Sequence, residues 1–170
     1  PYYERFLERF PTVEELAAAE IDEVLGLWAG LGYYSRARNL HAAAQMLVDD
    51  FDGRFPRSPK QARTLPGIGE YTCAAVTSIA FGEPLAALDA NAQRVLARIF
   101  GIRGDIRRGD ARKELQRIGR AAVDAKRPGE YNQALMELGA LVCTSGTPLC
   151  AECPMADICG AATLDIADQI

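Results

Sequence analysis

Four of the five cysteines lie close together near the end of the sequence. Cys143, Cys150, Cys153 and Cys159 are spaced as C-x6-C-x2-C-x5-C. Four thiolates within one short segment are the donor set of a structural zinc site or of an iron–sulfur cluster. Disulfide bonds are the competing explanation, but the sequence shows no secretory features, and thiols inside cells are normally kept reduced. The spacing therefore predicts a metal centre in this segment.

The compactness of the cysteine group bears on the identity of the metal. Zinc ribbons usually pair two short cysteine knuckles across a long gap, whereas these cysteines form one group that contains Pro148 and Pro154. The arrangement favours an iron–sulfur cluster, and zinc remains the alternative from the residues alone. Cys73 lies apart from the group within an apolar helical pattern, and we expect it to be a small buried core residue.

A second candidate site is the segment 65–69, Leu-Pro-Gly-Ile-Gly, between two helical patterns that cover Lys60 to Thr64 and Glu70 to Phe81. This order predicts a hairpin between two helices. Gly67 and Gly69 let the backbone turn tightly and leave its N–H groups unobstructed, next to the positive end of the following helix. Such a turn can bind a phosphate group without a lysine. The alternative is a tight turn that binds nothing.

The sequence pattern predicts that the elements positioning these residues are a succession of helices. Apolar side chains recur at steps of three and four residues, and no segment shows the alternation typical of a strand. Pro11 ends the first pattern, and Thr12 with Glu15 forms a capping-box start for the next. The fold class is therefore predicted to be all-α. Further apolar faces occur at Val24, Leu25 and Trp28, at Leu40, Ala43, Ala44 and Leu47, and at Ala92, Val95, Leu96 and Ile99.

Composition and charge narrow the class of protein. About half of the 170 residues are apolar, which is enough for one respectable core or two small ones. No apolar run approaches the roughly 20 residues that span a bilayer, and no secretory leader opens the sequence, so we expect a soluble intracellular protein. The net charge of −4 argues against a general positive field around the molecule. Any binding to nucleic acid must therefore be local.

Three motifs occur in the order found in the helix-hairpin-helix DNA glycosylase superfamily. They are the hairpin at 65–69, the Leu-Asp-Ala-Asn segment at 88–91, and the four cysteines, whose spacing resembles that family's [4Fe–4S] loop. The segment 30–40, Gly-Leu-Gly-Tyr-Tyr-Ser-Arg-Ala-Arg-Asn-Leu, resembles the A/G-specific adenine glycosylase (MutY) branch and not the endonuclease III branch. The resemblance covers nearly the whole chain, from Pro1 to about Ala162, and implies the helix-hairpin-helix glycosylase fold with a [4Fe–4S] cluster.

The activity implied by this resemblance is base excision repair: removal of adenine mispaired with 8-oxoguanine or guanine by hydrolysis of the N-glycosidic bond. Bifunctional members place a lysine two residues after the last hairpin glycine, where its amine attacks the sugar. Tyr71 stands there in this chain, which implies a monofunctional enzyme in which Tyr71 lines the base pocket. Asp89 is expected to stabilise the positive charge that develops on the deoxyribose, and Asn91 to orient the catalytic carboxylates. Either residue would also suit a helix cap near Ala92.

The same resemblance implies double-stranded DNA with an A:8-oxoguanine or A:G mispair as the partner, with the adenine taken out of the base stack. Tyr33 is expected to enter the duplex beside the mispaired base. Arg36 and Arg38 are expected near phosphates, and Gly67 and Gly69 are expected to bind the backbone through the hairpin. From the residues alone, the two arginines are equally consistent with a solvated helix face.

Departures from the family pattern lower the activity expected of these 170 residues. The glutamate that protonates adenine in the family lies before the position matched by Pro1, and the C-terminal domain that recognises 8-oxoguanine would follow the cysteine segment. We therefore expect the chain to be inactive alone. The loop Thr144–Leu149 has no basic residue, which together with the acidic net charge predicts weak, salt-sensitive DNA binding.

The expected architecture is two all-α lobes. Residues 1–83 would contain the hairpin and residues 84–170 the cluster loop at 143–159, with the base pocket between Tyr71 and Asp89. A structural role is expected for the cluster, since hydrolytic base excision transfers no electrons. We expect a cytoplasmic monomer, associated with the nucleoid if bacterial. Three alternatives remain open: a DNA-binding homologue without catalysis, an endonuclease III-like glycosylase for damaged pyrimidines, and a zinc-stabilised interaction module.

Overall fold

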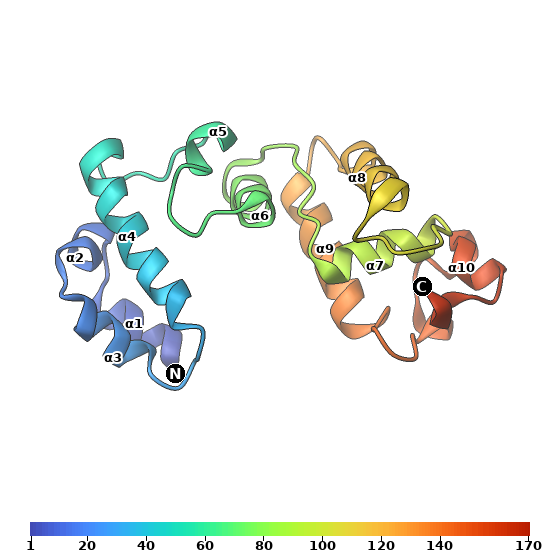
Figure 1. Ribbon diagram of the computed structural model, residues 1–170, viewed down its shortest axis with the longest axis horizontal. Coiled ribbons are helices and arrows are strands. Elements are labelled where there is room, and N and C mark those ends of the chain that lie inside the picture. Colours follow the sequence, from blue (N-terminus) through green and yellow to red (C-terminus); the bar gives the residue numbers. More distant parts are fainter. The chain divides into compact units, whose positions relative to one another are not determined.

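The computed structural model describes residues 1–170, and every regular element in it is a helix (Figure 1). Ten α-helices and three short 3-10 helices occur, with no strand, which confirms the all-α prediction. No helix combines the length and the apolar composition that crossing a membrane would require. The chain divides into two compact units, Pro1–Gly69 and Glu70–Ile170, which are described separately below.

The first unit contains five helices. Its core is formed by Phe10, Leu16, Val24 and Ala44, which are almost fully buried. Thr12 Oγ1 accepts a hydrogen bond of 3.2 Å from the backbone N–H of Glu15, so the helix start predicted there is present with Thr12 as its N-cap. The helices are α1 Tyr2–Arg9, α2 Val13–Ala18, α3 Ile21–Trp28, α4 Tyr34–Phe51 and α5 Pro59–Ala62.

The second unit is built around α7, which packs against α8, α9 and α10. Its α-helices are α6 Glu70–Phe81, α7 Ala90–Ile99, α8 Gly109–Ala122, α9 Pro128–Leu141 and α10 Gly160–Thr163. Its 3-10 helices are Cys150–Glu152, Ala156–Ile158 and Ala167–Gln169. Burial of apolar side chains from α7, α8 and α9 supplies the main stabilising free energy of this unit. Those core residues are Ala92, Val95, Leu96, Ala97, Leu115 and Leu135.

The division between the units falls at Gly69, before the lobe boundary expected at Glu83. Helix α6 belongs with the second unit because it packs closely on α9. A Cβ atom added to Gly129 would lie 3.0 Å from the Cα of Ile79, so the two helix backbones approach each other closely at this point. Tyr71 and Asp89, which we expected in different lobes, consequently lie in the same unit.

Candidate functional site

Asp89 occupies the N-cap position of α7. Its backbone is extended, and its Oδ1 accepts a hydrogen bond of 2.7 Å from the N–H of Ala92. Short polar side chains are favoured at this position because they satisfy an N–H group that the helix itself leaves unpaired. The cap expected from the sequence is therefore present at Asp89, and it fixes one carboxylate oxygen at the positive end of α7.

Tyr71 lies in the first turn of α6, with 39% of its surface exposed. The pKa of its phenol is raised above the ordinary value, first by burial and second by the negative charge of Asp89. The Asp89 carboxylate is thus the second of the two causes of the raised pKa. The Tyr71 hydroxyl also lies 3.7 Å from the sulfur of Met136 on α9. Tyr71 and Asp89 thus each lie at the N-terminal end of a helix of the second unit, Tyr71 in the first turn of α6 and Asp89 at the N-cap of α7.

Asn91 is held in place by Arg94, a residue that the sequence analysis missed. Arg94 Nη2 donates to Asn91 Oδ1 at 3.0 Å and to the carbonyl oxygen of Gly139 at 2.7 Å, and Nε donates to the carbonyl oxygen of Cys143 at 2.9 Å. One guanidinium group therefore joins the start of α7, the end of α9 and the start of the cysteine segment. Nothing in the local sequence distinguishes Arg94 from a surface arginine.

A second missed residue, Asn132, holds the extended segment that leads to Asp89. Its side chain is fully buried, its Oδ1 accepts from the N–H of Ala87 at 2.9 Å, and its Nδ2 donates to Leu85 O and Ser78 Oγ, both at 2.8 Å. The amide thus satisfies two backbone groups of a segment without regular secondary structure. Asn132 fixes the path of the chain just before the Asp89 cap.

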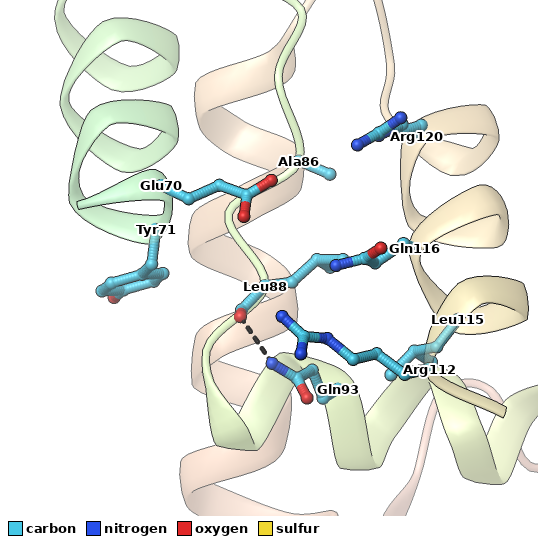
Figure 2. Close-up of a pocket in the computed structure, with 9 residues that line it drawn as sticks. All are labelled: Glu70, Tyr71, Ala86, Leu88, Gln93, Arg112, Leu115, Gln116 and Arg120. Atoms are coloured by element: carbon cyan, nitrogen blue, oxygen red, sulfur yellow. Dashed lines mark hydrogen bonds between the residues drawn. The ribbon is translucent and has the colours of Figure 1, made fainter. Parts of the chain in front are cut away.

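A pocket of about 190 Å³ opens beside Tyr71 and Leu88 (Figure 2). Its walls come from the first turn of α6, the segment 86–88, the start of α7 and one side of α8. The Gln93 side chain donates to the carbonyl oxygen of Leu88 at 2.8 Å and so closes the wall nearest to Asp89. The lining residues are Glu70, Tyr71, Ala86, Leu88, Gln93, Arg112, Leu115, Gln116 and Arg120.

Tyr33 and Arg36, both expected to contact DNA, lie together in the first unit. Tyr33 has a left-handed backbone with φ of 48° and is 79% exposed, although left-handed backbone is unusual for a residue with a side chain. The guanidinium carbon of Arg36 lies 5.6 Å from the centre of the Tyr33 ring. Trp28 Nε1 donates to Gly32 O at 3.0 Å and steadies the preceding turn. Arg38 is exposed on α4.

The turn predicted at 65–69 follows α5 along the chain and precedes Glu70, the first residue of α6. Gly67 has φ of +79°, and a Cβ atom there would lie 2.8 Å from Cβ of Asn39, so both conformation and space require glycine. Gly69 is exposed, with open space where a Cβ would be. The turn therefore leaves its outer backbone accessible, as a backbone-binding hairpin requires.

The four cysteines of the terminal group line one cavity of the second unit, together with Arg98 and apolar side chains. All four are free thiols. Burial, followed by the charges of the other three cysteines, raises the pKa of the Cys150 thiol. No three Cys, His, Asp or Glu side chains in the chain are arranged to hold a metal ion. Cys73 is buried in α6, as expected.

Arg98 of α7 is nearly fully buried beside this cavity and was also missed by the sequence analysis. Its Nη1 donates to Thr144 O at 2.6 Å and lies 3.4 Å from the sulfur of Cys143, and its Nε donates to Ile170 O at 3.1 Å. The Cys159 thiol lies 3.4 Å from the Arg98 carbonyl oxygen. A buried cation among thiols offsets the negative charge that thiolates would bring.

Known DNA repair proteins align with most of this chain. The model of the family described as "HhH-GPD superfamily base excision DNA repair protein" matches residues 1–121. Human adenine DNA glycosylase is 44% identical over 161 residues, which cover 94% of this chain and 30% of the human protein. The adenine DNA glycosylase of Schizosaccharomyces pombe is 41% identical over 162 residues, covering 94% of this chain and 35% of that protein. The chain thus spans about a third of the length of these relatives.

Solved structures show the same fold. A thermostable thymine-DNA glycosylase superposes with a TM-score of 0.85 and 31% identity, covering 96% of this chain and 75% of the other. A trapped covalent intermediate of endonuclease III with DNA gives a TM-score of 0.81 and 26% identity, covering 97% and 76%. With the family model matching well over half of its residues, the chain belongs to the HhH-GPD superfamily of base excision DNA repair proteins.

Proposed function

We propose that this chain is the core of a monofunctional DNA glycosylase that removes adenine mispaired with 8-oxoguanine or guanine. The observation that carries the proposal is the Asp89 carboxylate fixed at the N-cap of α7, with its charge contributing to the raised pKa of Tyr71, in a chain 44% identical to human adenine DNA glycosylase. A lysine nucleophile is absent at position 71. The chemistry proposed is therefore hydrolysis of the glycosidic bond without strand cleavage.

In the proposed reaction, Asp89 stabilises positive charge on the deoxyribose as the bond to adenine breaks. A fixed carboxylate is effective because it does not have to reorganise as that charge develops. Tyr71, whose pKa is raised, stays protonated at neutral pH and borders the sugar as a neutral group. Asn91, held by Arg94, supports the position of Asp89 two residues away along the chain. A glutamate from a segment before Pro1 would protonate the adenine ring.

Contact with double-stranded DNA is proposed for the hairpin and for the start of α4. Gly67 and Gly69 would present backbone N–H groups to phosphate, Tyr33 would fill the space left by the flipped adenine, and Arg36 and Arg38 would contact phosphates. We propose that the protein acts inside the cell as a monomer, in the cytoplasm and at the nucleoid if it is bacterial.

A [4Fe–4S] cluster bound by Cys143, Cys150, Cys153 and Cys159 is proposed as the cofactor. The donor set fits, because the four free thiols line one cavity beside the buried Arg98. Each thiolate binds a different iron of such a cluster, so the sulfurs need not surround one common point as they would around a single zinc ion. When bound, the cluster would supply a structural cross-link. Arg98 would hold the first cysteine of the group against α7.

Single-turnover release of adenine tests the function. The substrate is a duplex with adenine opposite 8-oxoguanine, and the two proteins are this chain and the same chain preceded by the segment that carries the family's glutamate. We expect release by the longer protein and none by the shorter. A duplex with thymine opposite guanine is the control substrate, because a thymine-DNA glycosylase shares the fold. Failure of both folded proteins, with iron bound, would overturn the proposal in favour of a DNA-binding role without catalysis.

A further inference from the structure

One face of α8 carries a row of polar side chains that neither the fold nor the proposed chemistry uses. Arg112, Gln116 and Arg120 are spaced four residues apart, so they lie on the same side of the helix. All three line the pocket beside Tyr71 and Leu88, where Figure 2 shows them extending from α8 opposite Glu70. Leu115, next to this row, anchors α8 in the core.

The two arginines of this row differ from the other cations of α8 in their partners. Lys113 lies 3.1 Å from a carboxylate oxygen of Asp110, and Arg117 lies 2.6 Å from a carboxylate oxygen of Glu114. Arg112 and Arg120 form no ion pair with any carboxylate of the chain, although both are exposed. The pocket therefore gathers the two unpaired cations of the helix on one side.

The size and the donor chemistry of the pocket limit what it can bind. Its volume of about 190 Å³ is below the 300 Å³ or so at which pockets for whole organic ligands begin. Guanidinium groups bind phosphate through two parallel hydrogen bonds, and the amide of Gln116 adds a further donor. A phosphate group fits both the volume and these donors.

We propose that Arg112, Gln116 and Arg120 form a phosphate subsite for the DNA strand that passes Asp89. This inference rests on the proposed function and extends it by naming a second point of backbone contact, on α8. The location supports DNA as the source of the phosphate, because Gln93 and Leu88 form the wall shared by the pocket and the Asp89 cap. In the proposed complex, a strand whose sugar lies at Asp89 would place a neighbouring phosphate along this wall.

Glu70 opposes the two arginines within the same pocket. Its carboxylate points into the space between α6 and α8 in Figure 2, and no ion pair joins it to Arg112 or Arg120. Its negative charge weakens the attraction of the pocket for phosphate. The subsite is therefore expected to bind a phosphate weakly. It would add to the affinity that other DNA contacts provide, and it would not bind DNA tightly alone.

The test is the salt dependence of DNA binding, measured by fluorescence anisotropy with a labelled duplex that carries adenine opposite 8-oxoguanine. For duplex DNA, the slope of log affinity against log salt falls by roughly 0.9 for each phosphate that the protein no longer neutralises. We expect Arg112→Gln and Arg120→Gln each to reduce the slope by about that amount and to weaken binding several-fold at low salt. Glu70→Gln should strengthen binding.

Arg117→Gln is the matched control, since it makes the same change in net charge on the same helix, away from the pocket. It should leave the slope unchanged. If Arg112→Gln and Arg120→Gln behave like Arg117→Gln, the subsite is overturned while the proposed function stands. If the arginine variants lower the slope but the glutamate-bearing protein releases no adenine, the subsite stands and the proposed function fails. A glutamate-bearing protein that binds no duplex at low salt and releases no adenine would overturn both.

Discussion

Arg94 donates a hydrogen bond from Nη2 to Oδ1 of Asn91 at 3.0 Å, and its guanidinium also holds the first residue of the cysteine segment. Asn91, two residues after the Asp89 cap, and the first residue of the cysteine segment are therefore connected through one side chain. A change in the cysteine segment that moved the carbonyl of Cys143 would shift the Arg94 guanidinium and with it the hydrogen bond to Asn91. This connection gives a physical route by which a structural cluster could support catalysis without taking part in it.

Replacing Arg94 tests this connection. Arg94→Lys keeps the charge, but an ammonium group lacks the planar fork that binds the three acceptors at once. We expect the single-turnover rate of adenine release by the glutamate-bearing protein to fall about tenfold, equivalent to about 1.4 kcal/mol of transition-state free energy. Arg103→Lys, at an exposed position, is the control. An unchanged rate in Arg94→Lys would show that Asn91 needs no support from this residue.

Asn132 should be important for stability. Asn132→Ala leaves the N–H of Ala87 and the carbonyl of Leu85 without their partner and removes the bond that Ser78 Oγ accepts, while Ser78 still donates to the carbonyl oxygen of Ala75. Because buried unsatisfied groups cost about 1–3 kcal/mol each and some of them will find water, we expect the free energy of unfolding to fall by about 3 kcal/mol. Urea unfolding measures this change. The control is Gln133→Ala, which changes the neighbouring exposed amide. It should lower the free energy of unfolding by less than about 0.5 kcal/mol.

Gly139 allows α9 to approach α7 at Asn91. A Cβ atom at this position would lie 2.8 Å from the Asn91 Cβ and 3.2 Å from its carbonyl carbon and oxygen. Since backbone atoms cannot rotate away, we expect Gly139→Ala to lower the free energy of unfolding by about 1–3 kcal/mol. Gly26→Ala, in open space within α3, should be neutral or stabilising by up to about 1 kcal/mol. Equal effects of the two variants on urea unfolding would contradict the close packing at Gly139.

The pKa of Tyr71 reports its proximity to Asp89. Burial and the charge of Asp89 both raise this pKa, so Asp89→Asn should lower it while leaving it above the ordinary value. Titration of 13C-labelled tyrosine rings by NMR measures the shift. Tyr131 is the internal control, because burial alone raises its pKa and Asp89→Asn should not change it. If Asp89→Asn left the pKa of Tyr71 unchanged, the two side chains would be too far apart to interact.

The raised pKa also predicts a pH dependence of stability. Folded Tyr71 keeps its proton at pH values where the unfolded chain, with an ordinary pKa of 10.0, has begun to lose it. The folded state therefore binds more protons between the two pKa values, and stability falls as pH rises through this window. The contribution is fully present below pH 10. Tyr71→Phe should reduce the loss of stability between pH 10 and pH 11 in thermal unfolding.

Iron content tests the role of the cysteine cavity. We expect the purified protein to be yellow-brown, with iron bound, and Cys150→Ala to lose both the colour and most of the iron because one ligand is missing. Cys73→Ala should keep its iron, since Cys73 is buried in α6, away from the cavity lining. A colourless wild-type protein with bound zinc would contradict the cluster proposal.

Much of the local structure follows from the sequence because its causes are local. The repeat of apolar residues predicts a helical chain, and α6 begins at Glu70 and ends at Phe81, as the pattern indicated. Thr12 caps α2 and Asp89 caps α7, since a side-chain acceptor three residues before an unpaired N–H needs no distant partner. The positive φ of Gly67 likewise follows from the type of residue in a tight turn.

Only the tertiary structure identified the residues that hold the candidate site. Asn132 and Gln133 are adjacent amides in one helix, and nothing in their spacing indicates that the first is fully buried and the second exposed. Arg94 and Arg112 are equally ordinary in the sequence, yet one bonds to Asn91 and the other faces a pocket. Their roles depend on partners far along the chain that folding brings near. Periodicity reports which face of a helix is apolar, whereas the packing of helices decides what each polar side chain meets.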